Sequence, residues 1–179
     1  LISEKEDQYR LNTFLSKLTQ HQIQVYPITE DFRHNSKVFS KEHTFYVPLE
    51  QAQYRVIIAL FNQDTDFQDN TFYDVSGWTM PLAMNIEFHQ VERTWGLSLA
   101  DKTWKMPSEH VDNINETAYA YAFDWHHFLA PKLLNTLLTH QIKARVATKP
   151  FTTYVAGKKR HFKTGSIVIP AGIQTAINW

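Results

Sequence analysis

The chain has 179 residues, of which 43% are hydrophobic and 14% aromatic, so it can build a packed core and does not have the composition of a disordered protein. Eighteen acidic and eighteen basic residues give a net charge of zero, which argues against a nucleic-acid-binding protein. The chain has no cysteine, which excludes disulfides, thiolate metal sites and a cysteine nucleophile. Its longest apolar run, Val56–Phe61, is too short to span a bilayer.

Helices and short strands are predicted to alternate through the first half of the chain. Apolar residues recur at helical spacing from Tyr9 to Leu18, which predicts a helix that ends near His21. Pro81 suits the first turn of a second, short helix. The elements expected here are the helix ending near His21, a strand over 23–27, a hairpin formed by 38–39 and 44–47, a helix over 51–62, a short helix over 79–84 and a weak strand over 87–92.

The second half of the chain shows a similar alternation. Asp124 is expected to be the N-cap of a helix that carries Pro131 in its first turn. The expected elements are a strand over 118–123, a helix over 128–139, a strand over 142–147, a hairpin over 153–162 and a strand over 166–169. Strands that alternate with helices at crossover lengths favour an α/β fold with a mixed, partly parallel sheet flanked by helices.

One sequence pattern occurs twice. Residues 14–23 and 133–142 align without a gap, and both contain a Leu-x-x-Leu-x-x-His-Gln-Ile-like ending. We therefore predict two similar helix–strand–hairpin units, at approximately 8–50 and 118–172, joined by a different middle section, 51–117. The histidines of the repeat, His21 and His140, are interpreted as helix-end residues, because C-terminal carbonyls favour a basic side chain.

Three histidine or serine patterns resemble catalytic or metal-binding motifs. His89 and Glu92 have the His-x-x-Glu spacing of two zinc ligands, but the segment alternates like an exposed strand, so we interpret both as solvated. The alternative is an independent metalloenzyme that uses these two residues. Adjacent His126 and His127 would point about 100° apart on a helix and would not converge on one ion. Ser76 lacks the Gly-x-Ser-x-Gly context of a nucleophile. From these three patterns together, we predict no catalytic residue, metal ligand or cofactor in this chain.

A group of aromatic residues near expected turns is the candidate binding surface. Tyr73, Asp74, Trp78 and Trp125 form it, because a tryptophan near a turn can pack one face and leave the other open to a ligand. The chain would then be a peptide- or carbohydrate-binding module with an aromatic groove. The other interpretation of these residues is simple packing in a core or between lobes.

Three groups of segments, in order along the chain, resemble one known family. The most specific is 72–84, which reads Phe-Tyr-Asp-Val-Ser-Gly-Trp-Thr-Met-Pro-Leu-Ala-Met. It resembles a signature of bacterial zinc carboxypeptidase-like proteins that lies downstream of the catalytic domain. The other matching segments are 9–11, 25–26, 46–49 with Gln51, 130–134, 145–147, 150–151 and 165–170.

The resemblance implies an accessory role. Chain 1–179 would be a single accessory domain excised from a longer chain, similar to class I glutamine amidotransferase-like α/β modules but without their cysteine nucleophile. Its partner would be the upstream peptidase domain of the same chain, with neither nucleic acid nor a membrane span involved. The parent would be a periplasmic or secreted zinc metallocarboxypeptidase that removes C-terminal residues from peptides. Zinc would be bound in that catalytic domain, not in this chain.

Overall fold

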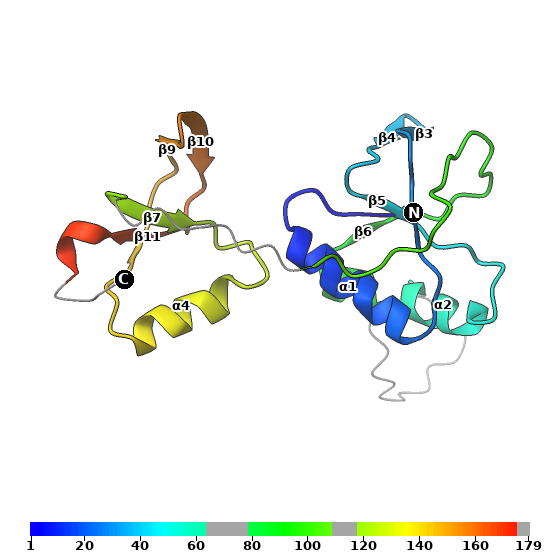
Figure 1. Ribbon diagram of the computed structural model, residues 1–179, viewed down its shortest axis with the longest axis horizontal. Coiled ribbons are helices and arrows are strands. Elements are labelled where there is room, and N and C mark those ends of the chain that lie inside the picture. Colours follow the sequence, from blue (N-terminus) through cyan, green and yellow to red (C-terminus); the bar gives the residue numbers. More distant parts are fainter. Residues whose placement is uncertain (64–78, 109–117, 175–179) are drawn as a thin grey trace, which may run out of the picture. The chain divides into compact units, whose positions relative to one another are not determined.

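A computed structural model of the chain describes residues 1–63, 79–108 and 118–174. The chain divides into two compact units, unit 1 (Leu1–Ser108) and unit 2 (Glu109–Trp179). Unit 1 is coloured blue to green and unit 2 yellow to red in Figure 1. The described residues form a mixed α/β structure in which small antiparallel sheets are combined with four α-helices. No helix in these residues has the length and apolar character needed to cross a membrane.

The main sheet of unit 1 has four short strands in the order β2-β5-β1-β6. Every neighbouring pair is antiparallel. Backbone bonds from the segment 98–104 continue the sheet beyond β2, for example from the Ala100 N–H to the Pro27 carbonyl (3.0 Å). The strands are β1 (Ile2–Ser3), β2 (Tyr26–Pro27), β5 (Thr44–Tyr46) and β6 (Glu87–Phe88).

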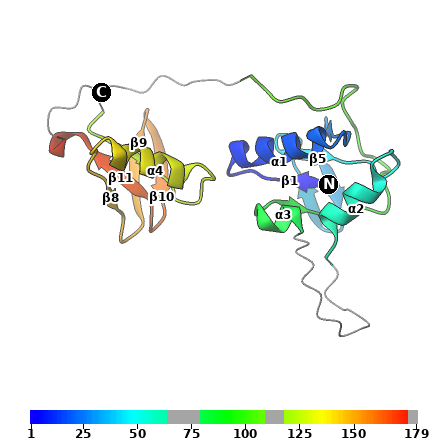
Figure 2. The ribbon, with the colours of Figure 1, turned by 90° about the horizontal axis from the view of Figure 1, so that it is seen from below.

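Three helices build the core of unit 1, and in Figure 2 they lie close together beside β1. Helix α1 (Gln8–Gln20) is capped by Asp7, whose side chain accepts a hydrogen bond from the Arg10 N–H (2.9 Å). Leu11, Phe14, Leu15 and Leu18 of its predicted apolar stripe are buried, whereas Tyr9 at the start of the stripe is 49% exposed. Helices α2 (Tyr54–Phe61) and α3 (Met80–Ala83) contribute to the same core.

A two-stranded hairpin contributes Phe32 and Phe39 to a second, smaller core in unit 1. Strands β3 (Phe32–His34) and β4 (Lys37–Phe39) are joined by a two-residue turn at Asn35 and Ser36. Both turn residues have positive φ (47° and 53°), which matches the type I′ turn that suits the twist of a hairpin. The prediction that 38–39 and 44–47 form a hairpin is therefore wrong. Strand β4 pairs with β3, which precedes it in the chain, and β5 belongs to the main sheet.

Unit 2 contains a three-stranded sheet, one helix and one hairpin. The sheet order is β7-β11-β8, with antiparallel neighbours. Helix α4 carries a proline in its first turn, as predicted. The elements are β7 (Ala120–Phe123), α4 (Ala130–Thr139), β8 (Arg145–Val146), β9 (Phe151–Val155), β10 (Lys158–Phe162), β11 (Ile167–Pro170) and a short 3₁₀ helix, η1 (Ala171–Ile173).

The two units share one topology. The order β1-α1-β2-β3-β4-β5 in unit 1 corresponds to β7-α4-β8-β9-β10-β11 in unit 2. The strand order also agrees, since β5 lies between β2 and β1 as β11 lies between β8 and β7. The pairing register is the same: Tyr26 faces Tyr46 in unit 1, and Arg145 faces Val168 at the equivalent positions in unit 2. The sequence repeat thus extends to a strand that precedes each helix.

The repeated His-Gln-Ile sequence ends both helices in the same way. Gln22 and Gln141 have φ of 61° and 59°, and the following isoleucine N–H donates back into the last helical turn. The bonds run from Ile23 to the Leu18 carbonyl (3.1 Å) and from Ile142 to the Leu137 carbonyl (2.9 Å). This is the Schellman arrangement, here with glutamine in the left-handed position usually occupied by glycine.

The prediction of a partly parallel sheet is wrong for the described residues. In unit 1, β1 and β2 run in the same direction because both are antiparallel to β5. The crossover through α1 therefore exists, but β5 separates the two strands that it connects. In unit 2, β11 separates β7 and β8 in the same way. Each unit is a split βαβ arrangement, and all its strand pairs are antiparallel.

Candidate functional site

The predicted aromatic surface falls largely outside the described residues. Of the predicted residues, Tyr73, Asp74 and Trp78 lie outside the described residues, and so does Ser76. Trp125 is described; it lies in the turn between β7 and α4, and 45% of it is exposed. One member of the predicted surface is therefore open to solvent, while the others remain a prediction.

Asp124 does not cap α4, because the helix begins six residues later, at Ala130, after a non-helical turn. Its buried carboxylate instead accepts a hydrogen bond from the Ser166 hydroxyl (2.7 Å) and lies 3.8 Å from the Arg160 guanidinium. Unit 1 has a similar contact at the equivalent strand positions, where the Thr44 hydroxyl donates to the Ser3 hydroxyl (3.3 Å). Asp124 thus has a structural role in joining β7 to β11.

His89 and Glu92, the His-x-x-Glu pair, line a cleft of about 740 Å³ in unit 1. Residues after β5, the apolar side of α2 and the segment after β6 form its walls. Burial, and secondly the nearby Glu50 carboxylate, raise the pKa of Tyr46, another residue of this cleft. Among the described residues, no group of three or more His, Asp or Glu side chains is placed to hold a metal ion.

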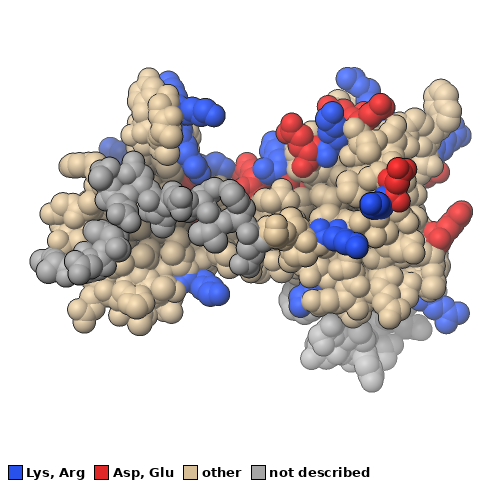
Figure 3. Space-filling model, viewed as in Figure 1, with Lys and Arg blue, Asp and Glu red and all other residues tan. Residues whose placement is uncertain are grey.

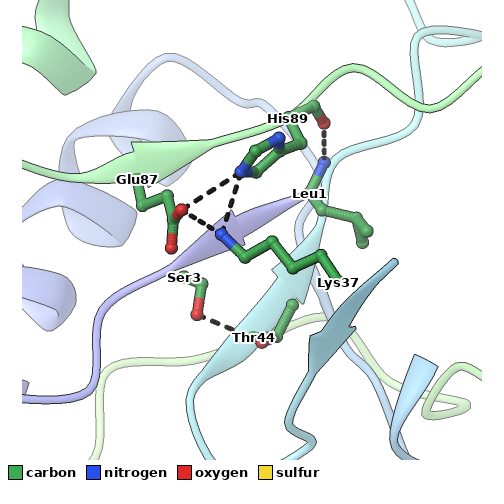
Figure 4. A network of polar contacts seen from close by, with 6 residues as sticks. All are labelled: Leu1, Ser3, Lys37, Thr44, Glu87 and His89. Atoms are coloured by element: carbon green, nitrogen blue, oxygen red, sulfur yellow. Dashed lines mark hydrogen bonds and ion pairs between the residues drawn. The ribbon is translucent and has the colours of Figure 1, made fainter. Parts of the chain in front are cut away.

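The His89 imidazole belongs to a polar network between β4 and β6, shown in Figure 4. Lys37 reaches across from β4 and donates to the Glu87 carboxylate. The His89 Nε2 atom lies beside both groups, 3.0 Å from the Lys37 ammonium and 3.2 Å from the Glu87 carboxylate. The Lys37 ammonium and the His89 ring also contact the Phe39 ring, at 5.1 and 5.2 Å from its centroid. The network therefore ties the β3–β4 hairpin to the edge strand of the sheet.

Electrostatics in this network favour a structural role. The hydrogen bond from Lys37 is the main cause that lowers the pKa of Glu87, so the carboxylate stays ionised. His89 Nε2 accepts from Lys37 in one ring tautomer and donates to Glu87 in the other, because an ammonium only donates and a carboxylate only accepts. In either tautomer, this nitrogen has its partner within the network.

A second cleft, of about 480 Å³, lies between the β3–β4 hairpin and the segment that follows β6. Arg33 and Arg93 line it, and neither guanidinium makes a hydrogen bond or ion pair with a described residue. Trp95 forms the rim and is 95% exposed. A β-turn presents this indole: the Leu97 N–H donates to the Thr94 carbonyl (2.9 Å), and Gly96 between them has a φ of +81°.

This combination suits a ligand with both negative charge and a flat apolar group. Guanidinium groups form paired hydrogen bonds with carboxylates, and an exposed indole offers a face for stacking. The Glu92 carboxylate is the opposing charge in the lining, so cationic groups exceed anionic ones. We call Arg33, Arg93 and Trp95 the cationic–aromatic cleft.

The sequence prediction missed the cationic–aromatic cleft. A tryptophan followed by glycine within the polar run 92–96 was the signal for an exposed turn. The two arginines are sixty positions apart in the chain, and only the fold brings them to one cleft. In comparisons with protein-family models, curated proteins and solved structures, nothing matches this chain.

Proposed function

We propose that the chain is a non-catalytic accessory region of a zinc metallocarboxypeptidase-like protein. The parent would remove C-terminal residues from peptides, and zinc would be bound in its catalytic domain. This region would pack against that upstream domain in a periplasmic or secreted protein. The basis for the parent's identity is the ordered resemblance of segments such as 72–84, 46–49 and 165–170.

The observation that supports an accessory role is what the resembling residues do in the fold. Segments 46–49 and 165–170 form or follow the central strand of their units, β5 and β11. After each strand, one glutamine side chain is used to hold the backbone. Gln51 accepts from the Gln24 N–H (2.8 Å) and donates to the carbonyls of Gln24 (3.3 Å) and Pro48 (2.6 Å).

Unit 2 repeats this set of three bonds from one glutamine side chain to the backbone, which we call the glutamine clamp. Gln174 accepts from the Lys143 N–H and donates to the carbonyls of Lys143 and Pro170, each at 2.9 Å. Side chains that make the same backbone contacts twice are part of a duplicated scaffold. The same glutamine in both units is therefore explained by architecture without reference to a reaction.

The coding sequence that precedes Leu1 and the purified chain together test this proposal. We expect the upstream sequence to encode a His-x-x-Glu pair, a later histidine and a catalytic glutamate. We also expect the purified 179-residue chain to bind no stoichiometric zinc and to leave peptides with free C-termini intact. Zinc bound by the chain itself, or an upstream sequence without a peptidase, would refute the proposal.

The cationic–aromatic cleft favours a second candidate function, a binding module for acidic peptides or carbohydrates. The predicted aromatic groove would then lie at Trp95 rather than at the residues chosen from sequence. Calorimetric titration with hexaglutamate, oligogalacturonate and neutral oligosaccharides tests this function. Trp95→Ala should weaken acidic-ligand binding about tenfold, whereas Arg55→Ala, at an exposed arginine outside the cleft, should not. No binding of any acidic ligand would eliminate this candidate.

A further inference from the structure

Helix α4 of unit 2 exposes the face that α1 buries in unit 1. Phe14 of α1 is 0% exposed, while Leu133, its equivalent in α4, is 44% exposed. Leu134 and Leu137 are likewise only partly buried, although their equivalents in α1, Leu15 and Leu18, are completely buried. These positions are equivalent through the sequence repeat, so the comparison is between matching sites of one topology.

The residues that cover α1 have no counterpart over α4 among the described residues. Phe14 packs edge-on against Phe61 of α2 (centroids 6.0 Å apart), and Phe61 packs in turn against Phe88 of β6 (5.4 Å). Ile57 of α2 is buried in the same cluster. The helix α2 and the strand β6 therefore form one continuous apolar cover over α1.

The sheet of unit 2 shows the same difference at its edge. Strand β1 lies between β5 and β6, so both of its edges are paired. Its equivalent, β7, pairs with β11, and no other described strand lies beside it. A strand edge that no described strand occupies, beside an exposed apolar helix face, can accept a strand together with a helix.

We propose that unit 2 binds a polypeptide segment of the same construction as α2 and β6. The segment consists of a short amphipathic helix, with apolar residues spaced like Ile57 and Phe61, followed by an extended stretch. The helix packs on Leu133 and its neighbours in α4, and the extended stretch pairs antiparallel with the edge of β7 opposite β11, beside which no described strand lies. This inference does not depend on the proposed accessory function.

The charge of unit 2 defines the partner further. Residues 118–174 contain eight Lys or Arg and a single acidic residue, Asp124. A partner segment that carries acidic residues beside its apolar face is therefore favoured over a basic one. In unit 1 the segment 79–92 meets this condition with Glu87 and Glu92, whereas 51–63 carries Arg55 and no acidic residue, so the two segments together have a net charge of −1.

The test is binding of a labelled peptide to the full 179-residue chain. The probe joins residues 51–63 to residues 79–92 through a short flexible linker, and fluorescence anisotropy measures binding. We expect saturable binding that Leu133→Asp weakens about tenfold or more, because the new carboxylate would be buried without a partner. Thr136→Asp is the matched control, since Thr136 and its equivalent Lys17 are both exposed. Circular dichroism confirms that both variants remain folded.

Hydrogen exchange locates the peptide. The full probe should slow exchange of the β7 amides, whereas a probe limited to residues 51–63 should leave them unchanged. A probe that fails to bind, or that binds the Leu133→Asp chain as tightly as the original, would overturn the proposal. So would a dimer of the chain that Leu133→Asp dissociates, because a second copy would then be the occupant of this surface.

Discussion

Gln51 and Gln174 hold the chain at the same point of both units, just after the central strand. Each side chain makes three hydrogen bonds to backbone groups of its own unit. Gln51→Ala should lower the free energy of unfolding by about 1–2 kcal/mol, because the strand loses these bonds in a partly exposed setting.

Urea unfolding of unit 1 measures this effect, with Gln53→Ala as the control. Gln53 lies two residues away and makes one long side-chain bond, to Gln22 (3.4 Å). The control should change stability by less than about 0.5 kcal/mol. Equal effects of the two substitutions would show that the clamp has no special role.

Glu87 gives unit 1 a small acid sensitivity. Its pKa in the folded state is lowered from 4.5, mainly by the hydrogen bond from Lys37. The stabilisation is therefore present above pH 4.5 and is lost as the pH falls through the lowered folded-state pKa. Both partners are substantially exposed, so the contribution is at most ~0.5 kcal/mol.

The variant Glu87→Gln isolates this contribution. We expect the difference in unfolding temperature between the original chain and the variant to be largest near pH 7 and to vanish near pH 3. Thermal unfolding followed by circular dichroism measures it across this range. A difference that persists at pH 3 would mean that the glutamate acts through packing rather than charge.

At the scale of elements, α1 and α4 have matched sequences and different environments. Phe14→Ala should cost about 3–5 kcal/mol, because it removes a fully buried ring from a packed core. Leu133→Ala, at the equivalent position of α4, should cost about 1 kcal/mol or less, because the side chain is already partly solvated. Urea unfolding monitored separately in each unit compares the two, and similar costs would contradict the exposed state of α4.

Local patterns predicted the helices, the C-terminal ends of α1 and α4 and one hairpin, because these features depend on residues close in sequence. The apolar stripe of α1, Pro131 in α4 and the turn at Ala156 and Gly157 are examples. Strand pairing was harder to predict. The two-residue strand β1 has no period to detect, and only the register with β5 and β6 makes it a strand.

The contacts of the candidate site residues were also hard to predict from local sequence. The sequence predicted that His89 is solvated on an exposed strand, whereas the structure places its Nε2 beside Lys37 and Glu87. The contact with Lys37 joins residues fifty-two positions apart, which no local pattern indicates. Asp124 was assigned to a cap because aspartate commonly begins helices, but a buried hydroxyl at Ser166 accounts for it instead.

At the scale of the whole molecule, the neutral net charge conceals an uneven distribution. The described part of unit 2 is strongly basic, and acidic side chains in Figure 3 gather mainly over unit 1. The zero net charge of the chain therefore does not exclude a polyanionic partner for unit 2. Charge and apolar exposure in unit 2 both point to contacts with an acidic, partly apolar partner.

The most direct test of the account is hydrogen exchange at two matched amides in the full chain. The N–H groups of Ile23 and Ile142 make the same bond at the end of their helices, at 3.1 and 2.9 Å. If unit 2 is a copy of the unit 1 scaffold without its α2–β6 cover, Ile142 should exchange much faster than Ile23 at the same pH and temperature. Equal protection of the two amides in the chain alone would contradict the account.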